Sequence, residues 1–197
     1  MQMTVSLEGR RETAEACLIA RARAGDSAAF GDLYAKYERA VFRYAYHLLA
    51  SRDDADDVKQ ETFVRAYQNL AGFRGDSSLY TWLLRICGNL CRDRAKSWER
   101  RCVTYAPTAG DQEICGSLHG ANPEDTVLKS ATADLIVGAL QALPAQHREV
   151  LVLHEIEGHD YNTIGEIFAC SPASVKLRVF RARKLLRQRV QSILNVR

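Results

Sequence analysis

Apolar residues recur at steps of three and four along most of this chain. In the N-terminal half the pattern covers residues 30–48 and 55–70, and it resumes over residues 79–96 after a break at 73–77. This spacing puts apolar side chains on one face of an α-helix, whereas a half-buried strand would alternate residue by residue. No run in the chain alternates strictly. The pattern therefore predicts helices and no strands.

The C-terminal part continues the pattern in shorter segments. These segments are residues 128–143, 146–156 and 161–169 and the stretch after Ser171. Pro144 and Gly158 interrupt them, as residues that end helices and make turns do. Ser171 and Pro172 mark the start of the last helix, because serine caps helix N-termini and proline is tolerated at the first helical position. In the N-terminal half the pairs 26–27 (Asp-Ser) and 53–54 (Asp-Asp) are the cap candidates.

The periodicity is lost in the middle of the chain. Two prolines and three glycines fall between residues 107 and 123. Such residues punctuate loops and linkers. We therefore predict an all-α fold in which two small helical domains, residues 18–101 and 125–192, are joined by a flexible linker at 102–124.

Composition narrows the class of protein. The hydrophobic fraction of 47% is sufficient to build a core. No stretch approaches the roughly 20 apolar residues that span a membrane, and the charged residues 1–11 are not followed by the apolar segment of a signal peptide. We expect a soluble cytoplasmic protein without membrane insertion.

The six cysteines suggest neither a metal site nor a disulfide framework. They are Cys17, Cys87, Cys91, Cys102, Cys115 and Cys170, with no C-x-x-C pair among them and no histidine cluster at metal-ligand spacing. Cys87 and Cys91 would share one helix face, which could hold half a metal site, but burial as small apolar side chains is the favoured interpretation. We expect reduced thiols, no metal and no cofactor.

The net charge of +3 conceals an uneven distribution. Residues 171–197 contain eight Lys or Arg and no acid, whereas residues 52–61 contain five acids and two bases. A basic end indicates polyanion binding, and an acidic helix start indicates a different, basic partner. The chain is therefore expected to bind two kinds of partner.

Residues 161–183 have the pattern of a helix-turn-helix. Ile164, Phe168, Cys170 and Val175 are spaced to pack two short helices across a turn, and Gly165 lies where they would cross. In this motif the second helix enters the major groove, where its cations meet phosphates and base edges. A helical hairpin with a solvated basic face is the plain alternative; the absence of acids favours DNA. The candidate residues are Ser174, Lys176, Arg178, Arg181 and Arg183.

Two sets of motifs resemble the extracytoplasmic-function (ECF) sigma factors of bacterial RNA polymerase. Residues 53–67 and 73–89 resemble sigma region 2, and residues 143–144 (Leu-Pro), 148–151 (Arg-Glu-Val-Leu) and the helix-turn-helix resemble region 4. The likeness covers residues 18–190, in the right order, and the linker fits the family's lack of a folded region 3. Gly165 stands where many relatives have alanine. Leu177 replaces a common small polar residue, so base preference at the −35 element cannot be carried over.

The resemblance implies a role for each set of residues. The acidic helix would dock on the polymerase. Composition alone is equally consistent with a solvated acidic N-terminus that only stabilises its own helix dipole. The candidate polymerase contacts are Asp53, Asp56, Asp57, Gln60 and Glu61. The candidate contacts to the −10 element are Phe73, Tyr80, Arg85, Asn89 and Arg92, with Arg94 and Lys96 beside them; Phe73 and Asn89 match positions that line the pocket for a flipped base. For Trp82 a core position is favoured. The helix-turn-helix residues would contact the −35 element.

The resemblance also implies the partners and the absence of catalysis. We expect binding to core RNA polymerase (its β′ clamp helices and β subunit), to promoter DNA and to an anti-sigma factor, and a monomer when free. One alternative is a helix-turn-helix repressor or activator that acts without polymerase, but it leaves the acidic helix and residues 73–89 unexplained. The other is a thiol- or metal-dependent enzyme or redox sensor. Its histidines, His154 and His159, lie in H-E-x-E-x-H, which differs from the zinc motif H-E-x-x-H.

Overall fold

The N-terminal unit is built from α-helices whose apolar faces meet. In the computed structural model residues 14–104 and 131–195 are described. Helical turns at 14–23 lead into α2 (Ser27–Leu49) and α3 (Arg52–Asn69), and a 3₁₀ turn, η1 (Leu70–Gly72), precedes α4 (Leu79–Thr104). No strand occurs in either described range. The prediction of an all-helical fold is confirmed.

Two of the three predicted caps are present, and one lies elsewhere. Asp26 caps α2 by accepting from the backbone N–H groups of Ala28 at 3.0 Å and Ala29 at 3.1 Å. The cap of α3 is Ser51 and not the predicted pair 53–54, because Ala50, the C-cap of α2, is in the left-handed region (φ 53°) and the next residue is already extended. The carboxylates of the pair 53–54 fall in the first turn, where acids suit the helix dipole.

Large buried side chains hold α2, α3 and α4 together. Tyr44, Leu33 and Leu84 are at most 2% exposed. Phe63 of α3 packs against Tyr34 of α2, with ring centroids 4.6 Å apart. Cys87 and Cys91 are buried in the same core, as expected. These contacts set the relative positions of α3 and α4, which carry most of the predicted site residues of this unit.

Residues 131–195 of the C-terminal unit form five elements. They are α5 (Ala131–Gln141), α6 (Ala145–Leu151), the π-turn η3 (Val152–Ile156), α7 (Tyr161–Phe168) and α8 (Pro172–Asn195). The predicted helix over 146–156 is therefore not uniform: its last turn widens, and the Glu157 N–H donates to the Val152 carbonyl, five residues back, at 2.9 Å. Single π-turns inside α-helices are rare and occur often at functional sites.

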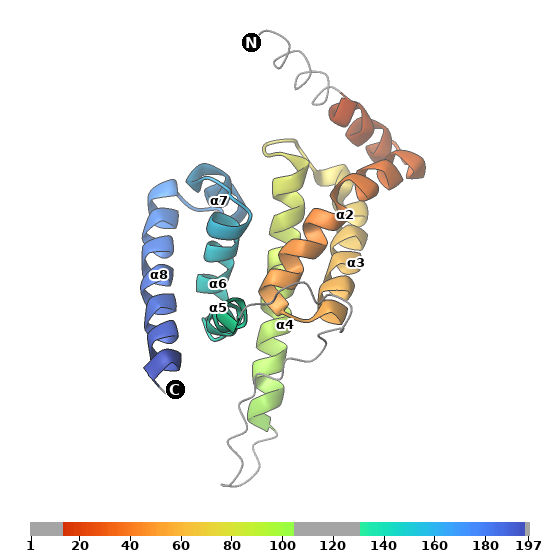
Figure 1. Cartoon of the computed structure of the whole chain (residues 1–197). Coiled ribbons are helices and arrows are strands. Elements are labelled where there is room, and N and C mark those ends of the chain that lie inside the picture. The colour runs from red at the N-terminus through yellow and green to blue at the C-terminus, as the bar shows by residue number, and fades with distance from the viewer. Residues whose placement is uncertain (1–13, 105–130, 196–197) are drawn as a thin grey trace.

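The two units pack against each other. In Figure 1, α6 and α7 lie between α4 of the N-terminal unit and α8 at the outer side. One continuous buried cluster runs through both units. No helix in the described ranges is long and apolar enough to cross a membrane.

Candidate protein and nucleic-acid interfaces

The predicted polymerase contacts form one acidic surface on α3, which consists of Asp53, Asp56, Asp57, Gln60 and Glu61. Four of them are exposed and Asp56 is half-buried. Asp56 accepts from Lys59 Nζ at 2.5 Å and from Gln60 Nε2 at 2.8 Å, and Glu61 pairs with Arg65 at 2.7 Å. These bonds join residues three and four apart on one helix, so they orient the side chains without covering them.

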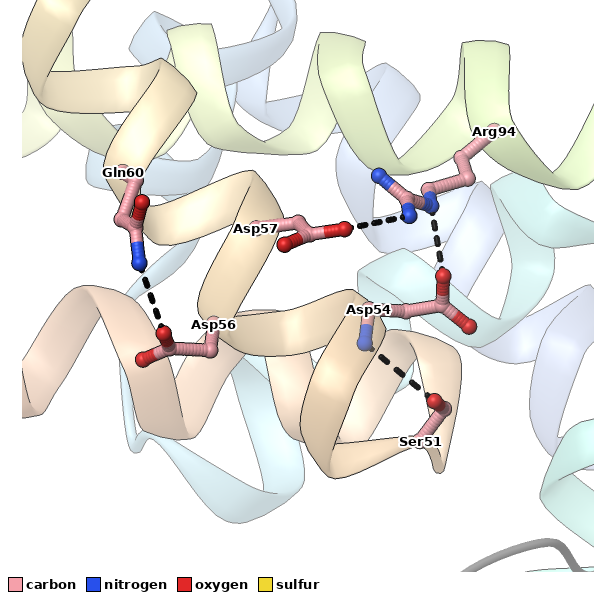
Figure 2. A network of polar contacts seen from close by, with 6 residues as sticks. All are labelled: Ser51, Asp54, Asp56, Asp57, Gln60 and Arg94. Carbon is pink, nitrogen blue, oxygen red and sulfur yellow. Dashed lines mark hydrogen bonds and ion pairs between the residues drawn. The ribbon is translucent and has the colours of Figure 1, made fainter.

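Arg94 of α4 reaches across to this acidic surface. Its Nε lies 2.6 Å from Asp54 Oδ1, and its terminal nitrogen lies 2.8 Å from Asp57 Oδ2 (Figure 2). Burial acts to lower the pKa of the Arg94 guanidinium, but the two carboxylates outweigh burial and the net shift is upward. The sequence interpretation placed Arg94 beside the −10 candidates; its contacts are instead with α3. Residues two apart on a helix point in different directions, which separates Arg94 from Arg92.

Three of the five −10 candidates come together on α4. Arg85 and Asn89 are exposed, Arg92 is half-buried, and their spacing of four and three residues puts them on one face. Arg92 donates to Asn89 Oδ1. We call these three residues the α4 strip. Asn89 is thus exposed and paired, which removes the cost of burying an unpaired amide beside the apolar residues of this helix.

The two aromatic −10 candidates lie apart from the strip and are less accessible. Phe73 is 7% exposed and packs against Trp82, with ring centroids 5.1 Å apart. Trp82 is itself partly buried against the core, as favoured above. Tyr80 is half-buried and stacks on Tyr37 at 5.6 Å. The ring of Phe73 can therefore support a pocket wall, but it presents little surface for stacking.

A buried carboxylate, which the sequence interpretation did not identify as a site, lies against the α4 strip. Glu149 of α6 is 1% exposed. It accepts from the Tyr44 hydroxyl at 3.0 Å and pairs with Arg92. Burial raises the pKa of Glu149, while Arg92 and Tyr44 act to lower it. The available signal in the sequence was an acid at the start of an apolar run, residues 149–153, where a charge needs a partner.

The helix-turn-helix has the predicted local chemistry. Ser171 caps α8 by accepting from the Ser174 N–H at 3.3 Å, and Asp160 caps α7 by accepting from the Thr163 N–H at 2.8 Å. A Cβ added at Gly165 would lie 2.7 Å from the Cys170 carbonyl oxygen, so the close approach of the two helices requires glycine here. The local backbone explains the departure from alanine.

The five −35 candidates occupy two sides of α8. Positions 174, 178 and 181 are spaced four and three apart and share one side, which we call the recognition face; positions 176 and 183 share another. Arg178 is half-buried and lies over the Phe168 ring at 5.5 Å. Arg183 pairs with Glu155 of η3 at 2.6 Å. The structure thus separates exposed Arg181 from Arg183, whose charge is already partly satisfied.

The described residues do not assemble a metal site. They contain no group of three or more His, Cys, Asp or Glu side chains that could hold a metal. His154 Nδ1 contacts the His159 carbonyl at 3.0 Å, and Glu155 and Glu157 pair with arginines. A hydrogen bond with Cys87, together with burial, raises the pKa of the Cys91 thiol, which disfavours the nucleophilic thiolate.

Comparisons with known proteins agree with this geometry. Family models described as Sigma-70 region 2 and Sigma-70, region 4 match residues 19–101 and 133–186. The RNA polymerase sigma-H factor of Pseudomonas aeruginosa is 33% identical over 90% of this chain and 94% of its own length. The ECF RNA polymerase sigma-E factor of Haemophilus influenzae is 32% identical over 90% and 95%. Among solved structures, CnrH in complex with the cytosolic domain of CnrY has a TM-score of 0.61 and 28% identity, covering 93% of this chain and 98% of that one.

Proposed function

Because this chain belongs to the sigma-70 family, as an ECF sigma factor, we propose that it divides promoter recognition among three surfaces of its own. A sigma factor associates with core RNA polymerase and directs initiation at particular promoters. The proposal concerns which residues do this here. Its two domains and linker would be residues 18–101, 125–192 and 102–124; residues 102–104 of this linker are the end of α4, and residues 105–124 lie outside the described range.

The acidic surface of α3 would dock on a basic element of core polymerase, the β′ clamp helices in this family, while other parts of the chain reach the β subunit. Three of its four carboxylates are exposed, and Arg94 of α4 donates a hydrogen bond to Asp57. Complementary charge of this kind steers association and fixes orientation more than it adds affinity. Such a surface needs several acids on one helix face, and this arrangement supports the assignment.

The α4 strip would hold the opened strand of the −10 element. A duplex hides its base faces, whereas a melted strand offers base edges and phosphates to an exposed amide and two flanking cations. Asn89 lies between Arg85 and Arg92 on one helix face, which is the arrangement such a strand requires. Phe73 and Tyr80 would shape the adjoining pocket, Phe73 from within the core.

The recognition face of α8 would read the −35 duplex. Ser174, Arg178 and Arg181 are on the side of the second helix of a helix-turn-helix, near its N-terminal end, where base edges are met. Lys176 and Arg183 would approach phosphates on the flank. One observation carries the proposal as a whole: one chain bears an acidic surface on α3 and, separately, cationic surfaces on α4 and α8.

Run-off transcription tests the proposal. Core polymerase is supplied with genomic fragments of the source organism, with and without this protein. Defined transcripts should appear when the protein is added. Arg181→Ala should lose most of them, whereas Arg189→Ala, the same change further along α8, should retain them. If core polymerase with the wild-type protein starts no transcript that core polymerase lacks, the proposal is wrong.

The proposal extends to the location of the protein, its oligomeric state and its regulation. We place the protein in the cytoplasm as a monomer when free, with the chemistry of RNA synthesis left to the polymerase. The similarity to CnrH, solved with the cytosolic domain of CnrY, supports regulation by a protein partner such as an anti-sigma factor. A repressor or activator that acts without polymerase is not favoured, because it has no use for the acidic surface.

A further inference from the structure

Two carboxylates of the C-terminal unit are buried against arginines of the N-terminal unit. Glu149 pairs with Arg92 of α4, and Glu157 pairs with Arg43 of α2, with nitrogen and oxygen 2.5 Å apart. The carboxylate side chains are 2% and 1% exposed. Charges this deeply buried remain ionised only with close counter-charges. Each pair therefore depends on the two units staying together.

The π-turn brings the two carboxylates to one side of the C-terminal unit. Eight residues on a regular helix would turn Glu157 about 80° away from Glu149. The extra residue of η3 takes up one step of about 100°, so Glu157 falls within roughly 20° of Glu149. The hydrogen bond that closes this turn is donated by the Glu157 N–H to the Val152 carbonyl. The π-turn thus lets both carboxylates face the arginines of α2 and α4.

Hydrogen bonds to backbone carbonyls and a ring contact complete the domain interface. Arg148 donates to carbonyls at the end of α5, Gln141 at 2.6 Å and Leu143 at 3.1 Å, and to the Leu48 carbonyl of α2 at 2.5 Å. The rings of Tyr80 and His159 lie 5.7 Å apart. One guanidinium therefore satisfies the ends of helices from both units, which is specific to this packing.

We propose that the free chain is held closed by Glu149 and Glu157, and that Glu149 occupies Arg92 as a strand phosphate would. The part about the strand rests on the proposed function of the α4 strip. A carboxylate and a phosphate offer similar oxygen acceptors to a guanidinium, so the two compete for one cation. Tyr80, the other −10 candidate at this interface, is covered by His159.

In the closed form the recognition face of α8 and the α4 strip differ in how accessible they are to DNA. The exposed residues of the recognition face, Ser174 and Arg181, remain accessible on α8, on the far side of the C-terminal unit from α4 (Figure 1). The Arg92 side chain is 25% exposed, but its guanidinium stays paired with Glu149 until the units separate. Arg178 also lies close enough to act on the Glu149 carboxylate and would remain beside it in the open form. The closed chain can therefore meet the −35 duplex, but it offers the −10 strand Arg85 and Asn89 without the cation of Arg92.

Gly88 gives a direct way to open the interface. A Cβ added there would collide with Glu149 Oε1 and lie 3.1 Å from the Tyr44 hydroxyl. Gly88→Ala should push the carboxylate away without harming α4, because alanine favours helix over glycine. Gly31→Ala in α2 is the matched control, since a Cβ there meets nothing within 4 Å. Arg43→Gln removes the second ion pair, because it leaves Glu157 buried without its cation.

Small-angle X-ray scattering on the full chain decides whether the interface holds. Wild type and Gly31→Ala should share one radius of gyration, and Gly88→Ala combined with Arg43→Gln should have a larger one. If the double variant is as compact as wild type, or if wild type is already extended, the closed form is refuted.

Binding to a fluorescent pool of random single-stranded 20-mers tests the competition. If the closed form holds 90% of molecules, opening it should tighten binding about tenfold in the double variant, Gly88→Ala combined with Arg43→Gln. A double variant that is open by scattering and binds the strand like wild type overturns the competition. Run-off transcription is scored separately: if no protein supports it, the proposed function fails, while the scattering result still decides the closed form.

Discussion

The Tyr44 hydroxyl donates a hydrogen bond to Glu149 Oε1 at 3.0 Å, and both residues are buried. Tyr44→Phe should therefore destabilise the protein by about 1–3 kcal/mol, because a buried carboxylate loses a hydrogen-bond donor. Urea unfolding gives the difference in free energy. Tyr46→Phe, an exposed tyrosine on the same helix, is the control and should change little. Equal stabilities of Tyr44→Phe and wild type would show that the bond contributes nothing.

The acidic surface should carry polymerase binding. Asp57→Lys combined with Glu61→Lys reverses two exposed charges and should weaken association with core polymerase by at least tenfold, with helical content by circular dichroism unchanged. Asp32→Lys makes the same kind of change at an exposed position of α2 and should bind like wild type. Wild-type affinity in the double variant would remove α3 from the polymerase interface.

The cations of α8 should differ in their contribution to duplex binding. The log–log dependence of the binding constant on salt has a slope of about 0.9 for each phosphate contact. Arg181→Ala should reduce the slope by about that amount. Arg183→Ala should reduce it less, since Arg183 already pairs with Glu155. Fluorescence anisotropy on a promoter duplex at several salt concentrations measures both slopes. Equal losses for the two variants would argue against this division of roles.

Asn89 should read one base of the opened strand. Asn89→Ala removes an exposed amide and should cost about 1–3 kcal/mol at one −10 position. Open-complex formation should fall, and preference at that base should relax, while polymerase binding stays intact. Permanganate footprinting on a matched promoter and on a premelted template measures this. Asn69→Ala is the control, because that amide only caps a carbonyl of its own helix, Arg65, at 2.8 Å. An unchanged footprint for Asn89→Ala would exclude the pocket role.

Mild acid should weaken the domain interface through two histidines. Burial lowers the pKa of His47 and of His159 below 6.5; Glu157 acts to raise both values and Arg43 to lower them, and Asp160 also acts to raise that of His159. Within the described chain His159 Nε2 is buried without a hydrogen-bond partner. Lowered values mean that the neutral rings stabilise the packed form above pH 6.5, and that this contribution is lost as pH falls through the lowered values.

Scattering between pH 7.5 and 5 would follow this opening. His159→Gln should flatten the profile, and His147→Gln should leave it as in wild type. Glu149 acts in the opposite direction, because its pKa is raised and protonation favours its buried state. A wild-type profile that His159→Gln does not alter would contradict the role of the histidine.

Local patterns in the sequence were sufficient for the helices and for most of their caps. Apolar periodicity located α2, α3, α4 and the C-terminal helices, because amphipathic spacing reflects the face that each helix buries. Ser51 was missed since the cap depends on where α2 ends, at a left-handed Ala50. The π-turn was also missed. Residues 150–153 are all apolar, so the apolar pattern there is the same whether the turn contains the usual number of residues or one more.

Long-range contacts explain the remaining differences at the candidate site. Arg92 and Arg94 are both cations on one predicted helix, but about 200° of rotation sends one toward Glu149 and the other toward Asp54 and Asp57. The contacts of Glu149 span more than fifty residues in the chain, and no local period encodes them. The resemblance to a family supplied roles for residues but gave no packing of one domain on the other.

The pairing of Arg92 with Glu149 limits how freely the two domains can be exchanged between relatives. A chimera that joins residues 14–104 of this chain to the C-terminal unit of a donor inherits Arg92 without a guaranteed acid opposite it. If the donor has an apolar residue at the position of Glu149, the Arg92 guanidinium would have no acceptor there. Packing the two units would then bury an unpaired charge, so the hybrid would stay open. Domain exchange thus alters the resting state of the hybrid as well as its −35 preference, so functional halves can combine into a protein whose regulation neither parent had.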